Sequence, residues 1–240
     1  MSAASIARLV CPPILLNGVA SARQRLRRAL RSARPRRHDG APLEQDLELY
    51  WNEHWARSLE TWGEGTAWNE IELLLANVDG KVLDIACGTG RVSHALRRFP
   101  NLELYGCDIS DMLIGKAHAR GLPPERFIVC DATATPYDAG QFDYGYSIGS
   151  LEHFTEPGIL QFIDECERII RVASFHHIPI ARDGRDHGWI TTAQSYFNNS
   201  VDWWLKRFAP RFPHAYALDS GWGDRISVGK WIICPTGRRA

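Results

Sequence analysis

The sequence lacks several patterns that would each point to a particular class of protein. None of its six cysteines stands in a CxxC pair or at a zinc-finger spacing, so we expect no metal site. We interpret these cysteines as buried thiols in a reducing compartment. No apolar run approaches the roughly 18 residues of a membrane-spanning helix. The chain also has no internal repeat.

The chain has no net excess of positive or negative charge, although its charged residues are unevenly distributed along the sequence. Lysine plus arginine and aspartate plus glutamate both total 28, and a net charge of zero argues against a general nucleic-acid binder. Residues 1–38 nevertheless hold nine arginines and no acid. Within residues 19–34 the arginines surround one apolar helical face, and Pro35 ends the pattern. We therefore treat residues 1–40 as a basic N-terminal extension.

This extension has three interpretations that the sequence does not separate. A basic amphipathic helix can lie on an anionic membrane surface. The same composition is also typical of a solvated basic arm and of an organelle transit peptide. Residues 41–70 have a different character, because an aromatic-rich helical period over residues 43–62 predicts a helical segment. Its aromatic residues could equally be core.

The stretch from Lys81 to Val92 has the strongest local pattern. Three apolar residues predict a buried strand, which leads into Gly88-Thr89-Gly90 and then a helix. Glycines in such a corner let a ligand press against bare backbone. Asp84 at the strand exit would repel a pyrophosphate, and Ser93 stands where a dinucleotide fingerprint has its third glycine or alanine. The corner therefore favours a positively charged ligand without phosphate.

Two further predicted strands also end in an acid. Asp108 follows the strand 102–107, and Asp131 follows the strand 127–130. The three acids are spaced by 24 and 23 residues, which is a stronger signal than the glycine pair alone. The two oxygens of Asp108 would suit the vicinal diol of a ribose. The alternative for Asp108 is a plain helix N-cap, a role that fits Asp111 better.

The segments DIACGTG and DISDML resemble the cofactor motifs of the class I S-adenosylmethionine-dependent methyltransferases. The resemblance implies S-adenosylmethionine as cofactor, with Asp108 on its ribose and with Asp131 and Ala132 on its adenine. It also implies an α/β fold, namely a doubly wound, seven-stranded, mostly parallel sheet with a final antiparallel strand and an N-terminal helical extension. In the family an N-terminal helical segment commonly covers the ligand pocket, and residues 41–70 resemble such a lid. The cofactor-binding residues that we expect are Asp84, Ala86, Cys87, Gly88, Gly90, Asp108, Ile109, Met112, Asp131, Ala132 and Ser147.

The run SIGSLEHF, residues 147–154, resembles the exit of strand 4 in small-molecule methyltransferases. That position faces the transferred methyl in the family, which makes Glu152 and His153 candidate catalytic residues. His177, just past the fifth predicted strand, is a third candidate. A histidine near neutral pKa is the natural base for a hydroxyl acceptor. The alternative is that Glu152 and His153 only open the next helix.

The methyltransferase domain should span residues 71–240, with an insertion for substrate recognition at about 179–211. The proline-glycine-glycine turn that usually follows the helix 157–170 in the family is missing here. This departure leaves the boundary between that helix and the next strand open. The insertion is rich in aromatic and amide side chains, which suit a polar ring such as a sugar but also suit ordinary packing.

We expect transfer of a methyl group to an oxygen of a small polar acceptor, such as a sugar of a cell-surface glycan or its precursor. On this hypothesis the protein is cytoplasmic, and residues 1–37 hold it at the inner face of the membrane. Alternatives are a lipid or other metabolite as acceptor, or a non-catalytic binding module. An oxidoreductase is disfavoured by Asp84, and a nucleic-acid base methylase by the absence of an Asn/Asp-Pro-Pro-Tyr/Phe tetrapeptide. The sequence does not indicate an oligomeric state.

Overall fold

The computed structural model describes residues 37–38, 41–42, 48–191 and 194–237. The chain divides into two units, residues 1–36 and 37–240, and the description below concerns the second. The basic segment 1–36 lies outside the described residues, as do residues 43–47 of the predicted lid. Within the described part of the chain, no helix is both long enough and apolar enough to cross a membrane.

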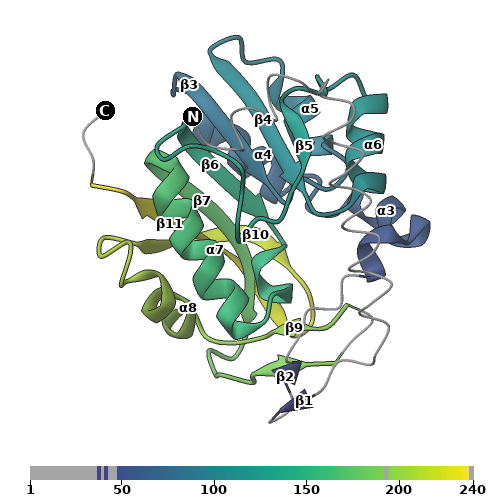
Figure 1. Ribbon diagram of the computed structural model, residues 1–240. Coiled ribbons are helices and arrows are strands. Elements are labelled where there is room, and N and C mark those ends of the chain that lie inside the picture. The colour runs from purple at the N-terminus through teal and green to yellow at the C-terminus, as the bar shows by residue number, and fades with distance from the viewer. Residues whose placement is uncertain (1–36, 39–40, 43–47, 192–193, 238–240) are drawn as a thin grey trace, which may run out of the picture. The chain divides into compact units, whose positions relative to one another are not determined.

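A seven-stranded sheet forms the centre of this unit (Figure 1). Its strand order is β10-β11-β7-β6-β3-β4-β5, and every neighbouring pair from β7 to β5 is parallel. β11 is antiparallel to both of its neighbours. The bounds are β3 (Gly80–Ile85), β4 (Leu102–Asp108), β5 (Phe127–Val129), β6 (Phe142–Ile148), β7 (Ile170–Ala181), β10 (Tyr216–Gly223) and β11 (Ser227–Pro235). This arrangement confirms the predicted fold class.

Helices cover both faces of the sheet, because successive side chains of each strand point to opposite faces. One core contains Val82 together with apolar residues of α4, α5 and α6, and the other contains Leu83 together with those of α7 and α8. Figure 1 shows α7 and α8 in front of the sheet and α4 behind it. The bounds are α4 (Ala67–Leu75), α5 (Arg91–Leu96), α6 (Asp111–Ala119), α7 (Glu156–Ile169) and α8 (Val201–Phe208).

Short elements complete the unit. They are β1 (Arg37–His38), β2 (Ala41–Pro42), η1 (Glu48–Trp51), α3 (Glu53–Leu59), η2 (Leu151–His153), β8 (Trp189–Ile190) and β9 (Tyr196–Phe197). η1 and α3 occupy the predicted lid segment, and the side chain of Asn52 caps α3 by accepting a hydrogen bond from the His54 N–H. β8, β9 and α8 are formed by the predicted insertion.

The boundary between α7 and β7, which the sequence left open, contains no turn. α7 ends at Ile169 and β7 begins at Ile170, so the chain passes directly from helix to strand. The chain ends in a hairpin of β10 and β11. The composition of residues 219–224, Asp-Ser-Gly-Trp-Gly-Asp, predicts a hairpin loop there, but residues 219–223 belong to β10. Their pairing with β11 contains a register shift between Asp219 and Gly223, which lets the strand continue past an irregularity.

The described cysteines are unpaired thiols, although not all of them are buried. Cys107, Cys166 and Cys234 are buried, whereas Cys87 and Cys130 are half-buried. The expectation of buried thiols therefore fails for Cys87, because that residue lies in the turn after β3 and lines a cavity.

Candidate functional site

The turn between β3 and α5 has the backbone that its glycines permit. Gly88 has φ +55°, and a Cβ placed there would meet only the side chain of Leu59, at 3.4 Å. Gly90 has φ +69°, but a Cβ there would lie 2.4 Å from Leu122 Cδ1. Gly88 thus leaves space for a ligand, whereas Gly90 permits close packing of α5 against the end of α6.

Asp84 lies at the floor of this turn. The Ser93 hydroxyl donates to Asp84 Oδ2 over 2.7 Å, and that same hydroxyl lies 3.1 Å from the Tyr146 hydroxyl. Burial raises the pKa of Asp84 to about 7, although the hydrogen bonds from Ser93 and Tyr146 oppose the rise. Ser93, which departs from the dinucleotide fingerprint, therefore serves as a hydrogen-bond donor to Asp84.

Asp108, at the end of β4, links the turn to the start of α6. Its Oδ2 accepts from the Gly88 N–H and its Oδ1 from the Ser110 N–H, both over 2.9 Å. Burial raises the pKa of Asp108 to about 6, and these backbone donors limit the rise. The side chain that caps α6 is that of Ser110, which accepts from the Leu113 N–H. Neither Asp108 nor Asp111 is therefore the N-cap.

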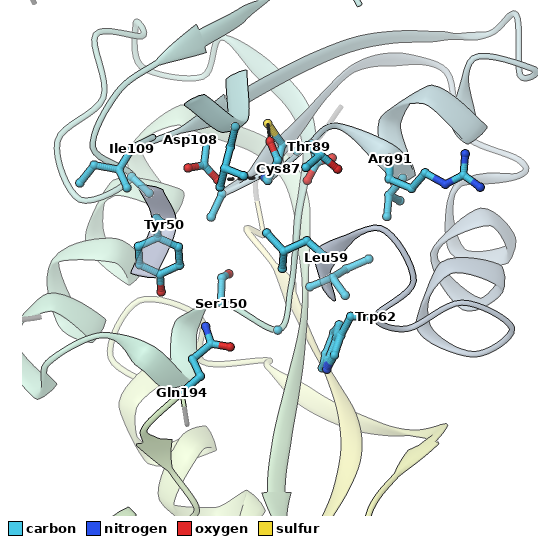
Figure 2. A pocket seen from close by; sticks show the side chains of 18 of the residues that line it. Tyr50, Leu59, Trp62, Cys87, Thr89, Arg91, Asp108, Ile109, Ser150 and Gln194 are labelled. Atoms are coloured by element: carbon cyan, nitrogen blue, oxygen red, sulfur yellow. Dashed lines mark hydrogen bonds between the residues drawn. The ribbon is translucent and has the colours of Figure 1, made fainter. Parts of the chain in front are cut away.

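A cavity of about 970 Å³, which includes the solvent at its mouth, extends along the carboxyl ends of β3, β4, β5 and β6. Figure 2 shows Leu59 and Trp62 entering it from one side and Asp108 and Thr89 from another. We call it the first cavity. Eight of the eleven predicted cofactor residues line it, namely Asp84, Ala86, Cys87, Gly88, Asp108, Ile109, Asp131 and Ala132.

Three predicted cofactor residues do not line the first cavity. Gly90 packs against Leu122, and Met112 is half-buried elsewhere on α6. Ser147 is fully buried, and its hydroxyl lies 2.9 Å from Nδ1 of His176. His176 stacks on Phe208 of α8, which places Ser147 toward the core on the other face of the sheet. These residues were expected to bind the cofactor because they lie close to the motifs in sequence. Closeness in sequence does not determine to which face of a strand a side chain points.

The lid segment is held to α6 by polar contacts. The indole N–H of Trp51 donates to Asp111 Oδ1 over 2.8 Å, and the Ser110 hydroxyl donates to the Tyr50 carbonyl over 2.6 Å. Arg120 donates to both carboxylate oxygens of Glu60 over 2.6 Å. Tyr50, Leu59 and Trp62 line the first cavity. The segment thus covers the cavity and is attached to the helix that begins beside Asp108.

A second cavity of about 610 Å³, including open solvent, adjoins the first. The two share the lining residues Leu59, Trp62, Gly149 and Gln194. Its own polar lining includes two of the predicted catalytic residues, Glu152 and His153. The remaining lining residues are Trp55, Ser58, Pro179, Tyr196, Trp222 and Asp224. Groups that could act on an acceptor therefore lie next to the cavity that holds the predicted cofactor residues.

His153 and Glu152 form a pair on η2. His153 Nδ1 lies 2.9 Å from the Ser195 carbonyl, and because a carbonyl only accepts, Nδ1 carries the proton and Nε2 keeps its lone pair. Nε2 lies 3.6 Å from Glu152 Oε1. Burial lowers the pKa of His153 to about 4 and raises that of Glu152 to about 8, so both are neutral near pH 7.

His177 is not placed as predicted, because it lines neither cavity. It is buried, its Nε2 lies 3.0 Å from the Ser220 hydroxyl, and its ring contacts those of Trp62, Trp222 and Trp231. Burial lowers its pKa to about 4. β11 pairs with β7 beside His177, and the His177 ring packs against two indoles that line the second cavity, those of Trp62 and Trp222.

Sequence reasoning missed several residues of the two cavities. Trp222 and Asp224 were assigned to a loop, and Tyr196 and Gln194 were not singled out from the insertion. The buried hydroxyls of Thr89 and Ser150 also line the first cavity. The available signal was the tryptophan between two glycines at residues 221–223, in a segment too polar to be core.

Comparison with known proteins agrees with this geometry. Residues 82–173 match the family described as a methyltransferase domain. A demethylmenaquinone methyltransferase from Thermotoga maritima is 33% identical over 114 residues, which are 46% of this chain and 48% of that relative. The chain therefore spans about half the length of this curated relative.

Solved structures share the fold at low sequence identity. A SAM-dependent methyltransferase from Aquifex aeolicus is 13% identical with a TM-score of 0.54, over 76% of this chain and 98% of the other. A Burkholderia thailandensis 1,6-didemethyltoxoflavin-N1-methyltransferase, solved with its substrate and S-adenosylhomocysteine, is 16% identical with a TM-score of 0.57, over 75% and 82%. Taken together, these findings show that residues 82–173 contain a methyltransferase domain and that the chain has the fold of class I, Rossmann-like S-adenosylmethionine-dependent methyltransferases.

Proposed function

We propose that this chain binds S-adenosylmethionine and methylates an oxygen of a small polar acceptor, such as a sugar of a cell-surface glycan or its precursor. The observation that carries the proposal is the shared wall of the two cavities, formed in part by Trp62 and Gly149. Buried carboxyls lie on one side of this wall, and a histidine with a free lone pair lies on the other.

The first cavity fits this cofactor on its own chemistry. The hydroxyls of Thr89 and Ser150 are buried there, and neither has a hydrogen-bond partner within the described part of the chain. Asp84 and Asp108 have raised pKa values because they are buried, and Asp84 has no cation among its hydrogen-bond partners. An ammonium group and a ribose diol would donate hydrogen bonds to Asp84 and Asp108. An adenine amino group would donate one to Asp131. When bound, the cofactor supplies a methyl group on positively charged sulfur.

The chain's own residues then position the acceptor and remove a proton. His153 Nε2 takes the proton of the acceptor hydroxyl, while the Ser195 carbonyl holds the opposite side of the ring. The cofactor, held by Asp84, Asp108 and Asp131, would supply the methyl group to that oxygen and would itself leave as a neutral thioether. The lid residues Leu59 and Trp62 line both cavities and exclude water from the place where they meet. Alignment alone can supply several kcal/mol of barrier lowering.

The basic N-terminal segment is a separate part of the proposal. Residues 1–37 would hold the enzyme against the anionic inner face of a membrane, next to a lipid-linked acceptor. Sedimentation of the full-length chain with vesicles of phosphatidylcholine and phosphatidylglycerol tests this point. Binding that increases with the anionic fraction is expected, and no binding at any fraction would remove the membrane from the proposal without affecting the catalytic part.

Calorimetric titration with S-adenosylmethionine and S-adenosylhomocysteine tests the central proposal. We expect micromolar binding that Asp108→Ala weakens at least about tenfold, since two hydrogen bonds to a buried charged group are lost. Asp183→Ala is the matched control, because that aspartate is exposed and lies outside both cavities. Absence of binding to the folded wild-type chain, or equal binding by Asp108→Ala, would refute the proposed function.

A further inference from the structure

The second cavity offers an acceptor no cationic side chain from the described part of the chain. Its described lining includes the carboxyl groups of Glu152 and Asp224 but no lysine or arginine. The guanidinium of Arg182 is engaged nearby, where it donates to the backbone carbonyls of Asp224 and Ser227. An anionic acceptor would therefore lose its hydration without gaining a cation, which is costly in a confined site.

A carboxyl group that lines the second cavity has one oxygen without a hydrogen-bond partner within the described part of the chain. Glu152 is 1% exposed, and its Oε2 forms no hydrogen bond within the described part of the chain. A buried carboxyl without an ion pair keeps its proton, as the upward shift of the Glu152 pKa indicates. The protonated group can both donate and accept, and a hydroxyl does the same. Glu152 therefore matches a hydroxyl better than it matches an ion.

Glu152 is adjacent to the proposed base, which adds a geometric requirement. Oε1 of Glu152 lies 3.6 Å from Nε2 of His153, so the two residues present their groups side by side. An acceptor hydroxyl that donates to His153 Nε2 would bring a neighbouring group of the same molecule close to Glu152, whose Oε2 has no partner within the described part of the chain. Two hydroxyls on adjacent carbons are the simplest structure that satisfies both residues at once.

The walls of the second cavity are aromatic. Trp55, Trp62 and Trp222 are half-buried and line it, and the rings of Trp62 and Trp222 lie 5.3 Å apart at 43°. The ring of Tyr196 contacts His153 edge-on with centroids 6.1 Å apart. Indole faces provide flat apolar area for the C–H face of a saturated ring, while the hydroxyls of that ring stay available to the polar floor.

We propose that the second cavity accepts an uncharged, saturated ring with two adjacent hydroxyls, of which one is methylated and its neighbour is held by Glu152. Any phosphate or carboxylate of the acceptor molecule stays outside this cavity. The inference rests on the proposed function, and it narrows the acceptor to a neutral polyol ring.

Saturation-transfer NMR on the full chain with S-adenosylhomocysteine tests this inference. The probes are the methyl glycosides of glucose, galactose and mannose, together with those of glucuronic acid and glucosamine as anionic and cationic counterparts. We expect at least one neutral glycoside to bind, and the uronate to bind about tenfold more weakly or worse. Glu152→Ala should lose at least about tenfold in affinity, and Glu152→Gln, which still donates and accepts, should recover most of it. Trp222→Ala should also lose binding, whereas the surface substitution Glu125→Gln should not.

The outcomes separate this inference from the proposed function. Binding of the uronate as tight as that of the neutral ring would overturn the inference, as would tighter binding of the amine that Glu152→Gln abolishes. Failure of every neutral glycoside to bind, while S-adenosylhomocysteine still binds in an Asp108-dependent way, would also overturn it. Loss of S-adenosylhomocysteine binding itself would instead refute the proposed function. In each variant, retained affinity for S-adenosylhomocysteine shows that the chain has folded.

Discussion

Trp62 lies so close to Gly149 that any side chain at position 149 would require the indole to move. A Cβ there would stand 2.4 Å from Cη2 of the indole, well inside contact distance. Both residues line both cavities. The missing side chain of Gly149 thus sets where the lid tryptophan rests, and the tryptophan in turn forms part of the wall between cofactor and acceptor.

Gly149→Ala should therefore displace Trp62 and weaken binding in both cavities. We expect affinity for S-adenosylhomocysteine to fall about tenfold, and a loss of about 1–2 kcal/mol in stability because φ at this position is +62°. Calorimetry and thermal unfolding measure the two effects. Gly140→Ala is the matched control, because φ there is +64° and nothing lies within 4 Å of its Cβ. Equal effects of the two substitutions on affinity would show that Trp62 has not moved.

The affinity for S-adenosylmethionine should rise with pH. At low pH the free protein carries protons on Asp108 and Asp84, whose pKa values are raised to about 6 and about 7. A ligand that needs the carboxylates must release these protons, so its Kd falls as pH increases through those values, by up to about tenfold per unit for each proton. Calorimetry in buffers of different ionisation enthalpy counts the protons released. Asp84→Asn should remove the upper part of the dependence, and a Kd that rises with pH would contradict the assignment.

The same two acids should make the free protein less stable as pH rises. Their folded pKa values lie above the ordinary value of 3.8, so the folded state binds more protons than the unfolded state between about pH 4 and 7. Buried His153 and His177, with lowered pKa values, act in the opposite sense below their ordinary value of 6.5. Urea unfolding should show that Asp84→Asn raises stability at pH 8 relative to wild type more than it does at pH 5. Equal gains at both pH values would count against the raised pKa.

Substitution of the two histidines should have different consequences. His153→Gln should lower the turnover number on a hydroxyl acceptor by roughly 10²-fold or more at pH 7, since the base is lost. His177→Gln should lower the melting temperature, because that ring packs among three indoles, with a smaller loss of turnover. Initial-rate kinetics and thermal unfolding on both variants distinguish these effects. If the turnover losses were reversed, the base would have been assigned to the wrong histidine.

The lid should open more readily when its attachment to α6 is weakened. Glu60→Gln removes the ion pair with Arg120, which is worth up to about 1 kcal/mol at this degree of exposure. S-adenosylhomocysteine should then dissociate up to about fivefold faster, and the difference should shrink at high salt. Stopped-flow tryptophan fluorescence measures the rate. Glu72→Gln, which breaks the ion pair with Arg98 away from both cavities, should leave the rate unchanged.

Much of the lining of the first cavity could be predicted from sequence, because the patterns that reveal it are local. Asp84, Asp108 and Asp131 each follow a strand, and parallel strands bring such residues to one edge of a sheet whatever the rest of the chain does. Ser147 shows the limit of this reasoning. It lies in β6 with its side chain toward His176, and a shift of one residue along a strand reverses the face.

The acceptor side was less predictable because its residues come together only through long-range packing. His177 lies within β7, where Trp222 of β10 and Trp231 of β11 pack against its ring, and nothing in the neighbouring sequence reveals these contacts. Trp222 reaches the second cavity from a segment that continues as strand past an irregular register. Glu152 and His153 could be named as candidates from the sequence because they follow β6 closely along the chain.

The wall that the two cavities share also has a thermodynamic consequence. If a ligand in the first cavity fixes the position of Trp62, it changes the affinity of the second cavity by some factor. Linkage then requires an acceptor to change the affinity for the cofactor by that same factor. The methylated product and S-adenosylhomocysteine would therefore each strengthen or weaken the binding of the other by the same factor, and that factor would depend on the contact between one indole and one glycine.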